Sequence, residues 1–122
     1  MRHVAMKLDA DTEAWELDDA EVRHRDAPDC YSLPALAERI RVGIGDRVDL
    51  FFLLRGRDQH GLFIQSERLS VTVREVSTHG YAGTLDTAPG SSTLLRAGDS
   101  ISFELRHITS IQSASATESP QP

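Results

Sequence analysis

Two Gly-Asp pairs in the second half of the chain each stand directly before a run of alternating apolar and polar residues. The first run is GDRVDLFF, beginning at Gly45, and the second is GDSISFEL, beginning at Gly98. Glycine and aspartate favour turns, and such alternation is typical of a strand with one buried face. Similar runs cover residues 67–73 and 81–85. A small domain built mainly from β-strands is therefore expected.

The strand pattern predicts an α+β fold that is mainly β, as a compact, strongly bent antiparallel sheet or small half-open barrel with one covering helix. Both faces of residues 48–54 are apolar, so this strand is predicted to be central. A slip in the alternation at Glu75-Val76 indicates a bulge. The last strand is expected at residues 100–107. The 122 residues fit one domain, predicted over residues 1–108.

Other segments are predicted to be helical or irregular. Ser32 is a candidate N-cap for the covering helix, which carries Leu33, Leu36 and Ile40 on one face for about three turns. Residues 55–61 are expected to be a polar connection. Residues 109–122 are rich in Ser, Ala, Thr, Gln and Pro, and this composition predicts a disordered tail.

The N-terminal part of the chain is strongly acidic. Seven acidic residues and no basic residue lie between Asp9 and Glu21, and the chain has a net charge of −6. After an expected short strand at Val4–Leu8, residues 9–26 are interpreted as a helix beginning at Thr12, separate from the β domain. One large aromatic residue amid these charges suggests a surface for a basic protein partner. The candidate residues for this surface are Glu13, Trp15, Glu16, Asp18 and Asp19.

Several functional classes find no support in the composition. The single cysteine, Cys30, excludes an internal disulfide and a multi-cysteine zinc site. No apolar run is long enough to cross a bilayer, and no signal peptide is recognised, so a cytoplasmic location without membrane partners is expected. Asp9, Asp11 and Glu13 have the spacing of a calcium loop, but Ala14 and Ala20 break its pattern. No metal, cofactor or catalytic residue is predicted.

Five segments together resemble a family of small bacterial β-rich domains of unknown function. They begin at residues 31, 45, 67, 83 and 98, as YSLP, GDRVDLFF, ERLSVTV, GTLDTAP and GDSISF. Ser70 and Thr87 depart from the family pattern, which tends to have tryptophan and asparagine there. The resemblance covers residues 31–108 and supplies no catalytic residues. Because similar domains recur among immunity proteins, it implies a bacterial protein that binds another protein. Lys7 is the only lysine among the 13 lysine and arginine residues, and this bias also suggests a GC-rich bacterial genome.

Three functions are therefore compared. The favoured hypothesis is a non-catalytic protein-interaction domain, as monomer or homodimer. The alternative is a small ligand-binding or hydrolytic domain that uses the loops at residues 55–61 and 86–93, with Asp58, His60, His79 and Asp86 as its site. Nucleic-acid binding is not expected from the net charge. It would require one face that gathers Arg47, Arg55, Arg57, Arg68 and Arg74.

Overall fold

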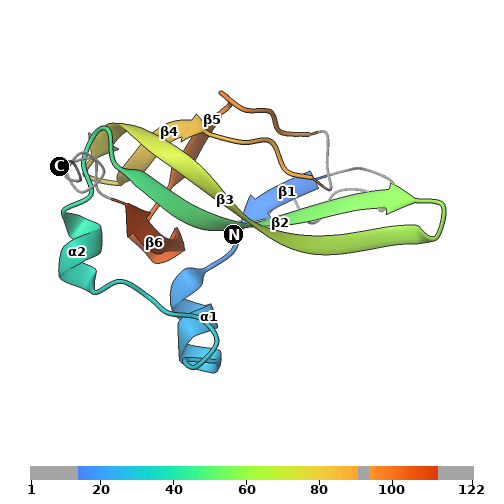
Figure 1. The fold of residues 1–122 in the computed structure, drawn as a ribbon, viewed down its shortest axis with the longest axis horizontal. Coiled ribbons are helices and arrows are strands. Elements are labelled where there is room, and N and C mark those ends of the chain that lie inside the picture. Colours follow the sequence, from blue (N-terminus) through green and yellow to red (C-terminus); the bar gives the residue numbers. More distant parts are fainter. Residues whose placement is uncertain (1–13, 91–93, 113–122) are drawn as a thin grey trace, which may run out of the picture.

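A computed structural model describes residues 14–90 and 94–112, without the side chains of Arg57 and Asp58. The described residues form a curled antiparallel sheet, which makes a half-barrel with few helices, so the predicted fold class is confirmed (Figure 1). The strands are β1 (Ala14–Leu17), β2 (Arg47–Asp58), β3 (Gly61–Ser77), β4 (Gly80–Leu85), β5 (Ser100–Phe103) and β6 (Ile108–Gln112). The helices are α1 (Ala20–Asp26), α2 (Leu36–Ile40) and the 3₁₀ turn η2 (Leu105–His107).

Strand β2 is the centre of this sheet, as predicted. The strand order is β1-β2-β3-β4-β5, and β6 also pairs with β2. On the edge opposite β3, β6 pairs with the first half of β2, from Arg47↔Gln112 to Leu50↔Ile108. Further along the same edge, β1 pairs with β2 from Leu17↔Phe52 to Ala14↔Arg55. One side of β2 is therefore shared by two short strands.

The core lies on the inner side of the curl. Val48, Leu50, Phe52 and Leu54 of β2 are fully buried there, together with apolar residues of β3, β4 and β5. Because side chains alternate along a strand, the odd-numbered positions of β2 lie on the outer face. The predicted alternation of β2 is therefore confirmed.

The first Gly-Asp pair forms a β-bulge. Gly45 N–H donates to Val73 O (2.9 Å), and Val73 N–H donates to Asp46 O (2.8 Å). Two residues of one strand thus oppose one residue of the other, with glycine in the left-handed region at φ 95°. The Asp46 carboxylate accepts a hydrogen bond from Gly43 N–H (2.9 Å) and closes the preceding turn.

The second Gly-Asp pair repeats the arrangement. Gly98 N–H donates to Leu85 O (2.7 Å), and Leu85 N–H donates to Asp99 O (2.9 Å). Gly98 also has φ 95°, and the Asp99 carboxylate accepts from Arg96 N–H (2.9 Å). The predicted turn role of both aspartates is therefore confirmed, and each pair fixes where its strand begins.

The predicted covering helix is wrong in its length and in its buried face. Helix α2 has only five residues and begins after Ala35, not at Ser32. Leu36 and Ile40 are 53% and 57% exposed, whereas Arg39 is buried. Hydrogen bonds of Arg39, rather than an apolar stripe, attach this helix to the sheet, as described below.

The predicted acidic helix is wrong over residues 14–17 and confirmed over residues 20–26. Residues 14–17 form strand β1, because Trp15 pairs with Leu54 at the core-facing side of β2. Helix α1 follows, with the Asp19 carboxylate accepting from Val22 N–H (3.0 Å) as its N-cap. Residues 1–13, which include the expected strand Val4–Leu8, lie outside the described residues.

Three further boundaries differ from the predictions. Residues 109–112, assigned to the tail, belong to β6, where Ile108 and Thr109 are buried. Residues 55–58, assigned to a polar connection, extend β2 and pair with residues 61–64 of β3. The last predicted strand ends at Phe103 and is followed by η2. The predicted bulge in β3 is confirmed within a residue or two, since the register shifts between Val73 and Glu75.

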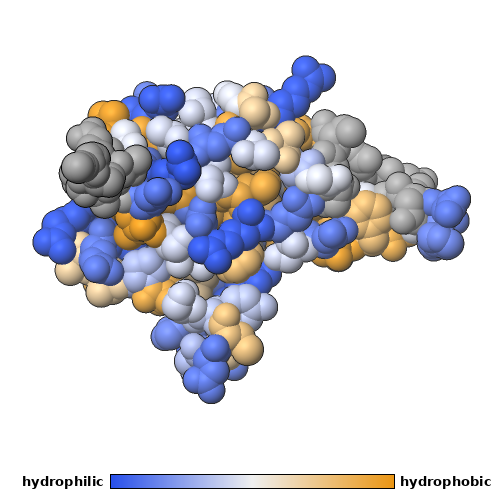
Figure 2. Space-filling model, in the orientation of Figure 1, coloured by the Kyte–Doolittle hydropathy of each residue, from blue (hydrophilic) through white to orange (hydrophobic). Residues whose placement is uncertain are grey.

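The far ends of β2 and β3 form an arm, residues 55–66, that stands out from the half-barrel (Figure 1). Phe63 covers Gly56 across the pair, because a Cβ built on Gly56 would lie 2.7 Å from the Phe63 ring. Leu62 and Ile64 are 44% and 65% exposed. Figure 2 shows apolar side chains on the arm behind a hydrophilic tip.

Candidate functional site

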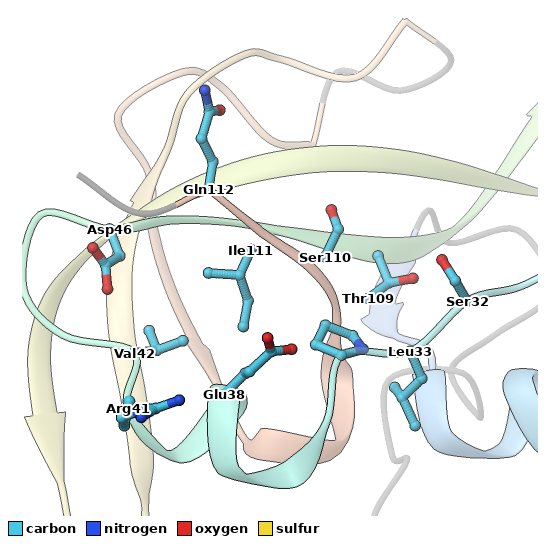
Figure 3. A pocket seen from close by; sticks show the side chains of 11 residues that line it. Ser32, Leu33, Glu38, Arg41, Val42, Asp46, Thr109, Ser110, Ile111 and Gln112 are labelled. Carbon is cyan, nitrogen blue, oxygen red and sulfur yellow. The ribbon is translucent and has the colours of Figure 1, made fainter. Parts of the chain in front are cut away.

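A hollow lies between β6 and the segment that leads into α2. It has a volume of about 660 Å³, and it is bounded by residues 32–34 and α2 on one side and by residues 109–112 of β6 on the other (Figure 3). We call this hollow the β6 groove. Its volume is within the range of about 300–1,000 Å³ that is typical of binding sites.

The groove has an apolar floor and a polar rim. Val42 is buried in the floor, and the partly buried Ile111 side chain points into the hollow (Figure 3). Glu38, Arg41 and Asp46 lie along the rim. Glu38 Oε1 accepts from Ala35 N–H (3.2 Å), so this carboxylate caps α2. Among the described residues, Arg41 makes no ion pair, and its side chain is exposed.

The wall along β6 is an open strand edge. Val73 of β3 exchanges hydrogen bonds with the residues at the start of β2, so the backbone C=O of Asp46 is directed towards β3. The backbone groups of successive residues in a strand are directed to opposite sides, so the N–H and C=O of Asp49 are directed towards β6. Asp49 pairs with Ser110. The next residue, Ile111, which lines the groove, consequently has its N–H and C=O directed away from β2, at the open edge of β6. Within residues 14–90 and 94–112, β6 pairs with no strand other than β2.

Arg39 holds the opposite wall in place. Its side chain is only 6% exposed, and Nη1 lies 2.6 Å from Glu21 Oε2 of α1. Nε donates to Pro34 O (3.0 Å) and Nη1 donates to Leu105 O (3.1 Å). The Tyr81 hydroxyl donates to Arg39 O (2.7 Å). One guanidinium thus joins both helices, the 32–34 segment and η2.

A polar network covers the outer face of the sheet beside the groove. Asp49 accepts hydrogen bonds from Arg68 Nη2 (3.0 Å), Ser70 Oγ (2.5 Å) and Ser110 Oγ (2.6 Å). Partial burial raises the pKa of the Asp49 carboxyl, but the hydrogen bonds from Ser110, Ser70 and Arg68 outweigh it and hold the pKa below its usual value. This carboxylate therefore stays ionised and ties β6 to β2 and β3.

A second ion pair extends the same face. Arg47 Nε lies 3.3 Å from Asp86 Oδ2, and Thr72 Oγ1 donates to Asp86 Oδ1 (2.8 Å). Arg47 Nη1 donates to Gln112 Oε1 (3.4 Å) at the end of β6. Both Ser110 and Gln112 line the groove, so the network and the groove are continuous.

The residues of the predicted acidic surface do not form a single exposed face. Trp15 packs against Phe52, with ring centroids 5.7 Å apart. Asp18 is paired with Arg23, and Asp19 caps α1. Glu16 Oε1 is buried. Glu13 lies outside the described residues.

The residues of the predicted loop site are also separated. His60 and His79 lie beyond opposite ends of β3, a strand of 17 residues and so about 50 Å of extended chain. Asp86 belongs to the outer-face network, and the Asp58 side chain is not described. His79 instead lines a hollow of about 320 Å³ with His107 of η2. Burial lowers the pKa of the His107 imidazole.

The arginine face required for nucleic-acid binding is present only in part. Arg47, Arg55 and Arg68 occupy outer-face positions of β2 and β3. Arg47 and Arg68 are paired with Asp86 and Asp49, which reduces the positive potential of this face.

Sequence reasoning missed the groove because its parts were assigned to other roles. Arg39 falls within the predicted covering helix, and nothing in the sequence marks it as buried. Ser110 and Gln112 were assigned to the tail. Ile108 and Ile111 are three residues apart, with Thr109 and Ser110 between them, so no regular alternation in the sequence marks this strand.

Comparisons of the chain with protein-family models, curated proteins and solved structures find no match in any of the three. The resemblance at residues 31–108 therefore remains a prediction. In the part of the chain that the structure describes, no helix has the length and apolar character to span a membrane. No cluster of metal-ligating side chains is found among the same residues.

Proposed function

We propose that this protein is a non-catalytic interaction domain that binds an extended segment of a partner protein in the β6 groove. The observation that carries the proposal is an open strand edge, at Ile111, facing a walled hollow of about 660 Å³. An extended peptide can pair with such an edge and so add one strand to the sheet.

Strand addition uses each part of the groove. The N–H and C=O of Ile111 supply two backbone hydrogen bonds, which do not depend on the peptide sequence. Alternate side chains of the peptide would then point inwards, over Val42 and Ile111, and outwards, beside Ser110 and Gln112. The inward positions favour aliphatic residues, because they would cover an apolar floor.

The test uses a displayed library of random seven-residue peptides, followed by Kd measurements on the selected peptides. Ile111→Pro removes the N–H that faces the groove and leaves the hydrogen bonds between β6 and β2 in place, because proline is tolerated at an unpaired edge. We expect this variant to raise the Kd at least about tenfold, because one buried hydrogen bond to the peptide is lost.

Two matched variants isolate the cause. Ile111→Ala shortens the same side chain but keeps the N–H, so it should weaken binding less than Ile111→Pro. Ile64→Pro makes the same backbone change on the open edge of the arm and should leave binding unchanged. Selected peptides that bind Ile111→Pro as tightly as the unaltered protein would exclude strand addition at β6.

A further inference from the structure

The outer face beside the groove indicates which side chains the bound segment carries. We infer that the groove selects an extended segment in which aliphatic and acidic residues alternate. This inference rests on the proposed function, since it concerns the side chains of the same added strand.

Two guanidiniums reach across the sheet to β6. Arg68 belongs to β3, yet its Nη2 donates to Ser110 Oγ (2.9 Å) on β6, across the intervening β2. Arg47 reaches Gln112 Oε1 at 3.4 Å in the same direction. The two groups therefore border the strip where the outward side chains of an added strand would lie.

These arginines keep hydrogen-bond donors for a ligand although each is paired with an aspartate. Their side chains are 53% and 51% exposed. A guanidinium has five N–H donors, and the described contacts leave the Nη1 group of Arg68 and the Nη2 group of Arg47 unused. By contrast, the Asp49 carboxylate already accepts from three side chains. A ligand therefore meets donors rather than acceptors on this face.

The rim adds a third cation. Arg41 is exposed on the groove wall and, among the described residues, makes no ion pair. The acidic rim residues Glu38 and Asp46 accept hydrogen bonds from backbone N–H groups. Charge-assisted hydrogen bonds between guanidinium and carboxylate are stronger than neutral ones. Acidic side chains on the outward positions of the segment are thus favoured, and basic ones are disfavoured.

The experiment measures fluorescence anisotropy with three labelled heptapeptides that alternate Val with Glu, Val with Lys, or Val with Ser. We expect the Val-Glu peptide to bind at least about tenfold more tightly than the Val-Lys peptide, with a difference that decreases as salt rises. The double variant Arg47→Gln/Arg68→Gln should remove most of this difference.

Two additional variants keep the result interpretable. Arg41→Gln changes an exposed side chain with no ionic partner among the described residues, so it should reduce the Val-Glu preference without affecting stability. Arg25→Gln removes an exposed charge from α1, at a residue that does not line the groove, and should leave the preference unchanged.

The outcomes separate this inference from the proposed function. Equal binding of all three peptides, still weakened by Ile111→Pro, would overturn the acidic preference and retain strand addition. Tighter binding of the Val-Lys peptide would overturn the preference in the same way. Failure of all three to bind, while library peptides without acidic residues bind and lose affinity in Ile111→Pro, would also overturn the preference. Val-Glu binding that is unaffected by Ile111→Pro would overturn the proposed function itself.

Discussion

Two open strand edges of the described sheet, that of β6 and that of the arm, differ in what lies opposite them. The edge of β6 at Ile111 faces α2 and residues 32–34 across the groove. In the arm, residues 62–66 of β3 pair with β2 on one side only, within the part of the chain that the structure describes. Open edges invite pairing with another strand. Of these two edges, that of β6 combines this property with a wall, an apolar floor and nearby charged groups.

This difference indicates what an open strand edge needs in order to select one peptide sequence over another. Ile64 is 65% exposed on the arm, so an added strand there would find backbone partners and apolar contact but few groups that discriminate between sequences. In the groove, Arg39 fixes the wall, and the Asp49 network fixes the strand. Under the proposed function, specificity at β6 depends on these polar contacts, because they hold the two sides of the groove in place.

The largest expected effect is a loss of stability of the whole sheet, which affects both edges. A Cβ built on Gly83 would lie 2.2 Å from Thr72 O, a backbone atom that cannot move aside. Gly83→Ala should therefore separate β4 from β3 and lower the free energy of unfolding by about 4 kcal/mol, the upper range for single substitutions. Urea unfolding measures this loss. Gly43→Ala, whose new Cβ would be 4.0 Å from its nearest neighbour, should change stability little.

A smaller effect should distinguish the two edges. Arg39→Met leaves Pro34 O, Leu105 O and the Glu21 carboxylate without their shared donor. Glu21 is 46% exposed and can be solvated, so we expect a loss of about 2–3 kcal/mol rather than the full cost of breaking a buried pair. Peptide binding in the groove should weaken, and NMR amide shifts of the arm should stay as they are. Equal shifts in the arm and around the groove would contradict the separation of the two edges.

The comparison also explains what the sequence could predict. The two Gly-Asp bulges and the buried face of β2 follow from local rules, because turn residues and alternation act over a few neighbouring positions. The fold class was predictable for the same reason. The groove was not, because it depends on contacts between residues far apart in the chain, such as Arg39 with Glu21 and Leu105.

The errors at α2 and β6 have related causes. Leu36 and Ile40 have the spacing of a buried helical face, but a helix of five residues is held by tertiary contacts and not by its own pattern. Residues 109–112 are polar enough to resemble the tail that follows. Pairing with β2 and the bonds from Ser110 to Asp49 order them as a strand. Nothing close in sequence to Ser110 indicates that it lies beside Asp49 and Arg68.

The smallest expected effect is that of low pH, which should weaken the hydrogen bonds that hold β6 and leave the arm unchanged. Because the pKa of Asp49 is lowered in the folded protein, its carboxylate stabilises the fold above the usual pKa of about 3.9, and this contribution is lost as pH falls through the folded value. Asp49→Asn should cost about 1 kcal/mol at neutral pH, since an amide replaces a charged acceptor. In the unaltered protein, NMR amide shifts of Ser110 and Gln112 should change as pH falls below the usual carboxyl pKa of about 3.9, while those of Leu62 and Ile64 change less. In Asp49→Asn, the acid-induced shifts at Ser110 and Gln112 should disappear. Their persistence in this variant would show that another group controls the edge, and the two edges would then not differ in the way that the Asp49 network requires.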